Sequence, residues 1–392
     1  MNIKKINLIL VLLMSIAFLS ATVSRAEGNK KDGGKNLRKT SQVSFTYLDV
    51  NNISTYFYNN GDSDLGPNSN SGFVYPKGSG KTAVFEAGFI WGAKIDTAAS
   101  QDPYVGGSTY GSGLQPGAVD LLTGKADDPN ADAASIFRAV APGTDLGPIA
   151  SNENISESAL KAQLDADAAN WPAAKGAPYD DVNNNGSYEP GTDIPGVPGA
   201  DMTLWFVAND LNNTLILQFY GAPTLGVEMQ ATIWAYNKAG ALGNMYFRKY
   251  KIINVTGRGG DTPAATTFYD MYVSMWADVD LGNAGDDFVG VDTVLSLQYC
   301  YNANAVDATY SPLPPPAVGF DFFQGPIVDA VAGQDRNKNG VDDGKASEFA
   351  IFAGDTLKGK VNLPMTAAYY FANGDANIGD PPLNNGPGAE GI

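Results

Sequence analysis

The clearest pattern in this chain is a period of two in its hydrophobic positions. Over residues 227–236, Val, Met, Ala, Ile and Ala alternate with Glu, Gln, Thr, Trp and Tyr. This alternation places the two sets on opposite faces of a β-strand. After a glycine-rich connection at residues 237–244, a second alternating run follows at 246–253. The two runs predict a long antiparallel hairpin.

Other segments have the same character, with β-branched and aromatic residues bounded by Gly, Asn, Asp or Pro. The predicted strands are Val43–Leu48, Ala83–Ile95, Thr203–Val207, Leu215–Tyr220, Val227–Tyr236, Met245–Val255 and Phe268–Ala277. We expect Phe268–Ala277 to add a third strand to the hairpin. Consecutive strands with polar connections favour a mainly β fold, an antiparallel β-sandwich of jelly-roll or Ig-like type, over a parallel α/β fold.

Helix is scarce in this pattern. Residues 158–169 (SALKAQLDADAA) have the composition of one short helix, ended by a Trp-Pro pair. We expect the sandwich region to span residues 43–372, as one large domain or two packed domains. Residues 27–42 predict a flexible lead. Residues 373–392 have hardly any large side chains, and we expect a linker-like tail that leads into further protein.

The amino terminus has the order of a secretory signal. Two lysines at positions 4 and 5 precede an apolar run over residues 6–19, and Ser24-Arg25-Ala26 supplies small residues for cleavage. We predict a signal peptide at residues 1–26, cut after Ala26, with Ala21 as the alternative. A run of about 14 residues is shorter than the roughly 20 that cross a bilayer as a helix. The mature chain is therefore expected to be exported and not transmembrane.

Composition narrows the possible functions. The chain has 25 Lys and Arg against 42 Asp and Glu, a net charge of −17, and the predicted signal contains no acid. This charge argues against nucleic acid or anionic lipid as partners. The chain has no histidine, which excludes Ser-His-Asp and Cys-His catalysis and His-ligated zinc. Its one cysteine, Cys300, lies in an apolar stretch and is expected to be a buried structural thiol.

An acidic loop supplies the first candidate chemistry. Residues 181–193 (DVNNNGSYEPGTD) place oxygen-bearing side chains at alternate positions before a glycine. Ca²⁺ takes about six to eight oxygen ligands, and alternate residues of a tight loop can all point inward. The position at which an EF-hand has its bidentate Glu is Thr192, so we expect a non-helical variant. The predicted ligands are the side chains of Asp181, Asn183 and Asn185, the main-chain carbonyl of Ser187, Glu189 directly or through water, and Asp193.

Two further segments repeat this chemistry, and together the three predict structural Ca²⁺. Residues 335–343 (DRNKNGVDD) open with the same D-x-N-x-N-G pattern, and a third cluster leaves the end of a predicted strand. Carboxylates this close raise one another's pKa values, so a bound cation is the simplest explanation. The alternative is that Asn, Asp and Gly only form turns. The candidate ligands are Asp335, Asn337, Asn339, Val341 and Asp343 in the second loop, and Asp278, Asp280, Asp286, Asp287 and Asp292 in the third cluster.

Two other functions are open to a chain of this kind. A glycan-active enzyme needs only two carboxylates at a set separation, and Glu86, Glu228 and Asp270 lie in predicted strands. Trp234 and Tyr236, on the polar face of their strand, either stack on sugar rings or pack against a second sheet. We expect a structural or adhesive module without catalysis, with a carbohydrate-binding module or glycan-active enzyme as the alternative. Candidate partners are cell-surface glycans or other surface proteins.

Several phrases of the sequence resemble a known group of proteins. They are PKGSGKTAVF (76–85) with GFIWGAK (88–94), VGGSTY (105–110) with GLQPG (113–117), WADVDLG (276–282) with GDDFVG (285–290), and VGFDFFQGP (318–326). Over residues 43–330 the chain resembles the amino-terminal region of large secreted proteins of the Bacteroidota and Ignavibacteria. Those proteins are described as hypothetical, fibronectin type III-containing or type IX secretion cargo. The resemblance implies a cell-surface or extracellular protein and carries no established activity.

Proteins of that group typically continue into further β modules and a carboxy-terminal sorting domain. This sequence ends at Ile392 in its linker-like tail. The expectation is therefore twofold: either the sequence is a fragment of a longer protein, or the sorting signal is absent and the type IX inference does not hold.

Overall fold

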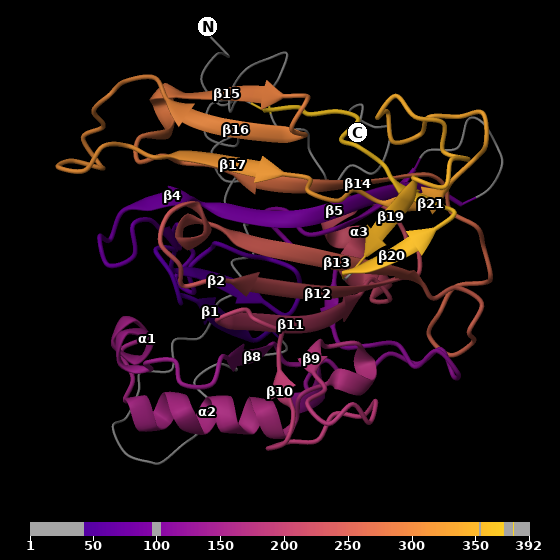
Figure 1. The fold of residues 1–392 in the computed structure, drawn as a ribbon, viewed down its shortest axis with the longest axis horizontal. Coiled ribbons are helices and arrows are strands. Elements are labelled where there is room, and N and C mark those ends of the chain that lie inside the picture. Colours follow the sequence, from indigo (N-terminus) through magenta and orange to yellow (C-terminus); the bar gives the residue numbers. More distant parts are fainter. Residues whose placement is uncertain (1–42, 96–102, 353, 372–378, 380–392) are drawn as a thin grey trace, which may run out of the picture. The chain divides into compact units, whose positions relative to one another are not determined.

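The computed structural model describes residues 43–95, 103–352, 354–371 and 379. The predicted signal peptide at 1–26, the lead at 27–42 and the tail at 373–392, apart from Gly379, lie outside these residues. Within the described residues the chain is mainly β, and its strands form several antiparallel sheets (Figure 1). The prediction of a mainly β, antiparallel sandwich is confirmed.

The largest sheet is built around strand β11, in which every residue is buried. The hairpin predicted from alternation is confirmed, because β12 and β13 pair antiparallel along their whole length. β13 lies at the edge of this sheet (Figure 1). Across the sheet its strands are β13 (Tyr246–Asn254), β12 (Val227–Ala235), β11 (Met202–Asn209) and β7 (Gln115–Pro116), and β8 (Phe137–Val140) also pairs with β11.

A second sheet contains β14 (Tyr269–Asp278), β5 (Glu86–Lys94) and β6 (Tyr104–Gly107). The expectation that β14 extends the β12–β13 hairpin is wrong, because β14 pairs with β5 instead. The long connection at residues 255–268 lets the chain cross between sheets, and β5 offers an edge of matching length. A hairpin of β1 (Phe45–Leu48) and β2 (Thr55–Tyr58) joins this sheet through bridges at Ser63.

The two sheets face each other across one hydrophobic core. Phe89 and Trp91 of β5 belong to the same buried cluster as Leu204 and Phe206 of β11 and Met229 of β12. Aligned sheets whose inner faces share a core form a β-sandwich. The burial of these apolar side chains is the main stabilising contribution to the fold.

The other face of β11 is covered as well. Trp205 and Val207 alternate with the core residues of β11 and pack against Phe137 and Trp171. On β8, the buried guanidinium of Arg138 pairs with the carboxylate of Glu153, which directly follows helix α1 (Gly147–Asn152). These contacts leave neither face of β11 open to solvent.

Helix α2 (Glu157–Ala169) confirms the predicted helix, and the side chain of Ser156 caps it by accepting a hydrogen bond from the amide of Ala159. The predicted strand Leu215–Tyr220 is wrong, because these residues belong to helix α3 (Asn213–Tyr220). Asn212 caps this helix, and Ile216 and Tyr220, four residues apart, are both buried. Short apolar runs do not distinguish helix from strand by pattern alone.

The remaining elements are short. A third antiparallel sheet contains β15 (Asp287–Asp292), β16 (Leu297–Asn302) and β17 (Ala317–Asp321). Two-stranded pairs are β3 (Phe73–Val74) with β4 (Thr82–Val84), β9 (Tyr179–Asp180) with β10 (Ile194–Pro195), β18 (Ile327–Asp329) with β21 (Lys360–Asn362), and β19 (Phe349–Phe352) with β20 (Asp355–Lys358). 3₁₀ turns occupy Asp132–Ala134, Ala173–Lys175, Ala241–Asn244 and Ala284–Asp286.

The one cysteine behaves as the sequence predicts. Cys300 of β16 is buried in a small apolar cluster with Ile53 and Leu281. Burial raises the pKa of its thiol to about 12, so the thiolate needed for nucleophilic chemistry does not form at neutral pH. No helix in the described part of the chain combines the length and apolar character needed to span a bilayer.

The core makes a direct prediction about stability. Leu204 is fully buried, whereas Leu122 is almost fully exposed. We expect Leu204→Ala to lower the free energy of unfolding by about 2–5 kcal/mol, because it removes buried methyl groups and leaves a cavity. The matched control Leu122→Ala is expected to change it by less than about 0.5 kcal/mol. Urea denaturation followed by tryptophan fluorescence measures both, and equal effects would contradict the assignment of the core.

Candidate functional site

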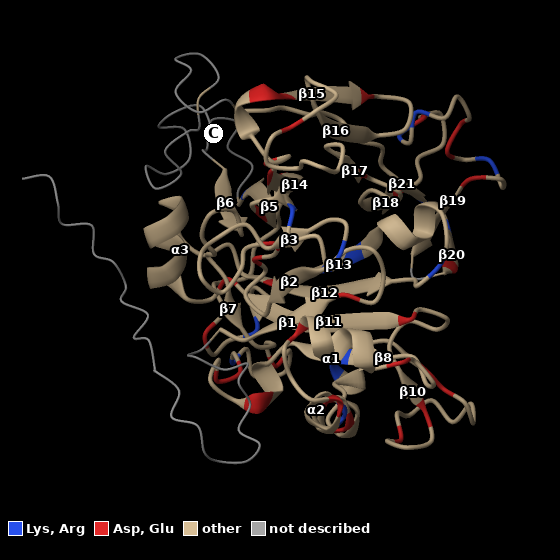
Figure 2. Cartoon of the chain, turned by 90° about the vertical axis from the view of Figure 1, so that its left-hand side faces the viewer, with Lys and Arg blue, Asp and Glu red and all other residues tan. Residues whose placement is uncertain are grey.

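The first predicted calcium loop connects the two strands of a short hairpin. Residues 181–193 lie between β9 and β10, which pair Asp180 with Ile194. The buried carboxylate of Asp193 closes the loop, accepting hydrogen bonds from the amides of Val182 at 3.1 Å and Glu189 at 2.7 Å. The loop carries Asp and Glu with no Lys or Arg (Figure 2). Nothing in the loop itself neutralises its negative charge.

Within this loop the side-chain oxygens turn toward the loop's own amides. The two carboxylate oxygens of Asp181 accept from the amides of Asn185 at 3.1 Å and Gly186 at 2.7 Å. The amide oxygen of Asn183 also accepts from the amide of Asn185, and that of Asn185 accepts from Ser187. Three predicted ligands therefore point into one turn.

The second loop, residues 335–343, repeats these hydrogen bonds at equivalent positions. The carboxylate of Asp335 accepts from the amides of Asn339 at 3.0 Å and Gly340 at 2.9 Å. Asn337 accepts from Asn339, and Asn339 accepts from Val341. The buried Asp343 accepts from the amides of Arg336 and Val331, as Asp193 does from Val182 and Glu189 in the first loop.

The backbone of the two loops also agrees. The fourth residue, Asn184 or Lys338, has a φ of 57° or 56°, and the glycine at the sixth position has a φ of 78° or 83°. Left-handed φ values favour glycine strongly and are tolerated by Asn. The two separate segments thus adopt the same loop conformation. The second does so although Lys338 must take an unfavourable left-handed φ.

Each loop has one further carboxylate within reach of its amide side chains. In the first loop Glu189 accepts from the side-chain nitrogen of Asn183 at 2.7 Å. In the second, Glu348 accepts from Asn337 at 2.9 Å and Asn339 at 2.7 Å, and these bonds lower the pKa of Glu348. Sequence reasoning missed Glu348 because it follows the end of the pattern.

The ligand chemistry of both loops fits Ca²⁺ better than a metal that needs several carboxylates. In the described residues, no three acidic or thiol side chains lie close enough to hold a metal by themselves. Ca²⁺ accepts amide and main-chain carbonyl oxygens beside carboxylates. The loops provide both kinds, with Asn183 and Asn185 in the first and Asn337 and Asn339 in the second.

Only some of the predicted ligands of the third cluster lie near one another. Burial raises the pKa of Asp280, and the charge of Asp287 raises it further; the pKa of Asp287 is raised first by burial and then by the charges of Asp286 and Asp307. One carboxylate oxygen each of Asp286 and Asp287 is buried without a hydrogen-bond partner in the described residues, as is the side-chain nitrogen of Asn302. Buried polar atoms without partners are costly.

Two predicted members of this cluster lie elsewhere. Asp292 ends β15, five residues beyond Asp287, and accepts hydrogen bonds from the amides of Val294 and Leu295. That places it roughly 16 Å along the strand from Asp287. Asp278 ends β14, where its carboxylate accepts from the hydroxyl of Tyr110 at 3.0 Å.

The structure adds one carboxylate to the third cluster that the sequence pattern did not predict. Asp307 is buried, and its two oxygens accept from the amides of Tyr310 and Asn283. Its charge also raises the pKa of Asp287. No local spacing identifies Asp307, because it lies twenty residues further along the chain.

A separate group of carboxylates surrounds Glu86 in β5. Glu86 is 3% exposed, and its pKa is raised from 4.5 to about 8, first by burial and then by the charges of Asp62, Asp278 and Asp64. Ser108 and Asn60 donate hydrogen bonds to Asp62. Glu86 is therefore held mainly protonated at neutral pH.

Of the three carboxylates considered for glycan hydrolysis, Glu86 and Asp270 are too far apart to act as a pair. Asp270 pairs with Lys94 at the far end of β5 from Glu86, and the β5–β14 register separates the two by roughly 26 Å. Glu228 is buried on β12, where it accepts from the amide of Val119 and the side chain of Gln230. Paired catalytic carboxylates lie about 5–10 Å apart.

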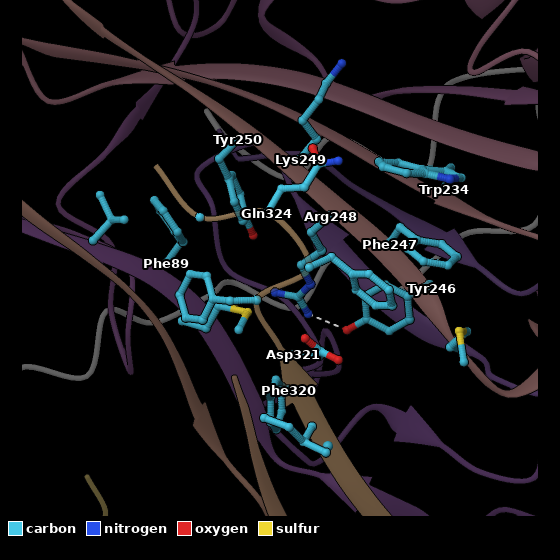
Figure 3. Close-up of a pocket in the computed structure, with 18 of the residues that line it drawn as sticks. Phe89, Trp234, Tyr246, Phe247, Arg248, Lys249, Tyr250, Phe320, Asp321 and Gln324 are labelled. Carbon is cyan, nitrogen blue, oxygen red and sulfur yellow. Dashed lines mark hydrogen bonds between the residues drawn. The ribbon is translucent and has the colours of Figure 1, made fainter. Parts of the chain in front are cut away.

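The aromatic residues singled out on β12 lie beside a large cavity. Trp234 stacks on Phe247 of β13, with ring centroids 5.3 Å apart and planes at 17°, and Tyr236 meets Phe247 edge-on. All three side chains are partly exposed and line the cavity, and Figure 3 shows Trp234 and Phe247 beside it. They do not pack into a second buried apolar face.

Comparisons with protein-family models, curated proteins and solved structures found no match to this chain. The resemblance of residues 43–330 to secreted Bacteroidota and Ignavibacteria proteins stays a prediction.

The environment of Glu86 predicts a pH dependence of stability. Its pKa is higher in the folded chain than the ordinary value, so its contribution is complete below about pH 4.5 and is lost as the pH rises toward about 8. We expect Glu86→Gln to remove this loss. The melting temperature of the variant minus that of the wild type should therefore increase from pH 5 to pH 8. Differential scanning calorimetry measures this difference. A constant difference across this range would contradict the raised pKa.

Proposed function

We propose that this chain is an exported β-sandwich module that bound Ca²⁺ stabilises and that has a structural or adhesive role at the cell surface or in the medium. The observation that carries the proposal is the shared geometry of the loops at 181–193 and 335–343. In both loops, the side-chain oxygens of the Asp-x-Asn-x-Asn series accept hydrogen bonds from amides at equivalent positions of their own loop. Turn formation alone does not require two distant segments to use the same residues in this way.

The predicted signal peptide supports this proposal from an independent direction. Export takes the chain out of the calcium-poor cytoplasm, so loops of modest affinity would be filled, as in extracellular calcium modules. The chain has one cysteine and so forms no internal disulfide. An exported chain without disulfides relies on bound metal or on a large core for rigidity.

The calcium ion would be held by named residues in each loop. In the first, these are Asp181, Asn183 and Asn185, with the carbonyl of Ser187 and the carboxylate of Glu189. In the second they are Asp335, Asn337 and Asn339, with the carbonyl of Val341 and the carboxylate of Glu348. Asp193 and Asp343 act as positioning residues, because both are buried and hold the loop through main-chain amides.

A carbohydrate-binding module is the second candidate, and a specific observation favours it. Trp234, Tyr236 and Phe247 form a partly exposed aromatic group at a cavity. Aromatic faces of this kind stack on apolar sugar faces. Titration of the chain with neutral oligosaccharides, followed by tryptophan fluorescence, tests this candidate. It predicts saturable quenching that Trp234→Ala abolishes.

The calcium proposal predicts a thermal shift. At a free Ca²⁺ concentration about 100 times Kd, each filled site stabilises the folded chain by about 2.7 kcal/mol. We expect the melting temperature to rise with Ca²⁺ and to fall on addition of a chelator. The double variant Asp181→Asn with Asp335→Asn should lose most of this shift, since each change removes a ligand charge.

The matched control is Asp165→Asn on α2, an exposed carboxylate that pairs with Lys161. It changes charge by the same kind of substitution and should keep the full calcium shift. Equal melting temperatures with calcium and with chelator in the wild type would contradict the proposal.

A further inference from the structure

The edge strand of the large sheet has an unused side. β13 pairs with β12 on one side only. Within the described residues, no main-chain group of residues 246–254 has a hydrogen-bond partner on its other side. A row of unpaired N–H and C=O groups on an edge strand is a template for another strand. β13 offers such a row over nine residues.

The cavity follows this edge. Every residue from 245 to 252 lines it, although alternation would bring only every second side chain of a strand to one face. Side chains from both faces of β13 therefore border the cavity, and Figure 3 shows those of Tyr246–Tyr250. The cavity volume is about 2080 Å³, about twice the upper end of the range for small-molecule sites. This size suits a polymer.

The lining of the cavity includes a run of prolines. These are Pro314, Pro315 and Pro316, which have no amide hydrogen to donate. The chain continues from there into β17, which pairs with β16. At these three successive positions the lining can donate no main-chain hydrogen bond to β13.

The side chains beside the edge follow an alternating pattern. On the core side, Tyr246, Tyr250 and Ile252 of β13 pack against the main core and are only partly buried, while Arg248 on the same side pairs with Asp64. On β14, Met271 and Val273 line the same cavity. An incoming strand would bury an apolar side chain at every second position against these residues.

On the outer side of β13 the pattern is cationic. Lys249 and Lys251 alternate with the core-facing residues, and neither has an ion-pair partner in the described residues. Burial lowers the pKa of Lys249, and the charge of Lys251 lowers it further. Asp321 is the single carboxylate among the described residues that line the cavity. In a chain of net charge −17, this is a local excess of positive charge that would attract acidic groups.

We propose that the cavity binds an extended polypeptide segment with alternating apolar and acidic side chains, as an added strand beside β13. Its main chain would pair with the free edge, its apolar side chains would face Tyr250 and Ile252, and its acids would face Lys249 and Lys251. Strand addition of this kind takes affinity from main-chain hydrogen bonds and specificity from alternate side chains. This binding rests on the adhesive role given under the proposed function and specifies its ligand. It does not depend on calcium binding.

The test uses a fluorescein-labelled nine-residue peptide that alternates valine and glutamate, titrated with the full chain in excess Ca²⁺ and followed by fluorescence anisotropy. We expect saturable binding that a peptide of the same composition in blocks does not show. Replacing glutamate by lysine in the peptide should abolish it. Two N-methylated peptides, blocked on either the valine or the glutamate amides, separate main-chain pairing from side-chain contact. Amides of alternate residues point to the same edge of a strand, and only one edge of the peptide faces β13. One of the two N-methylated peptides should therefore lose binding and the other should keep it.

The protein variant is Lys249→Glu with Lys251→Glu, which reverses the charge on the outer side of β13. We expect it to weaken binding about tenfold or more, since two cross-strand charge pairs become repulsive. The matched control, Lys161→Glu with Lys345→Glu, makes the same charge change at exposed positions away from the cavity. It should leave the affinity unchanged, and an unshifted melting temperature confirms that each variant folds.

Three results would overturn the proposal. The first is no saturable peptide binding, and the second is equal binding of the glutamate and lysine peptides. The third is saturable binding of oligogalacturonate in place of the peptide, which would assign the cavity to an acidic glycan. The calcium-dependent thermal shift is measured on the same samples, so failure of peptide binding and failure of calcium binding are distinguished.

Discussion

Carboxylates outnumber cationic side chains by 42 to 25, and the fold depends on how each buried carboxylate is satisfied. Asp210, which follows β11, accepts hydrogen bonds from three successive amides that lead into β12. Asp64 pairs with Arg248, and Glu153 pairs with Arg138. An unpaired charge in a core costs several kcal/mol. These pairings therefore hold loops against the sandwich.

The fold was predictable where burial acts on one strand at a time. The alternation at 227–236 and 246–253 predicted the β12–β13 hairpin correctly, because one face of each strand must reach the core. It did not predict which strand β14 would join, since pairing with β5 depends on residues nearly two hundred positions away. The segment Leu215–Tyr220 was also misassigned, because a short run with five apolar residues in six fits a partly buried helix turn as well as a strand.

For the candidate site, too, local features were predictable from the sequence and long-range ones were not. The D-x-N-x-N-G openings predicted the turn and its inward oxygens, because those hydrogen bonds are local. Glu348 and Asp307 were missed, because both meet their partners only after the chain has folded back. The reach of the third cluster was overestimated, since Asp292 lies at the opposite end of β15 from Asp287. The free edge of β13 has no signature in the sequence, because it results from β14 crossing to the other sheet.

Calcium stoichiometry tests the central claim most directly. Equilibrium dialysis of the full chain against radioactive calcium counts the bound ions without relying on stability. The proposed geometry predicts saturable binding of at least two ions per chain, with one ion lost in Asp181→Asn, one in Asp335→Asn and none in Asp165→Asn. Absence of saturable binding, or equal stoichiometry in all three variants and the wild type, would contradict it.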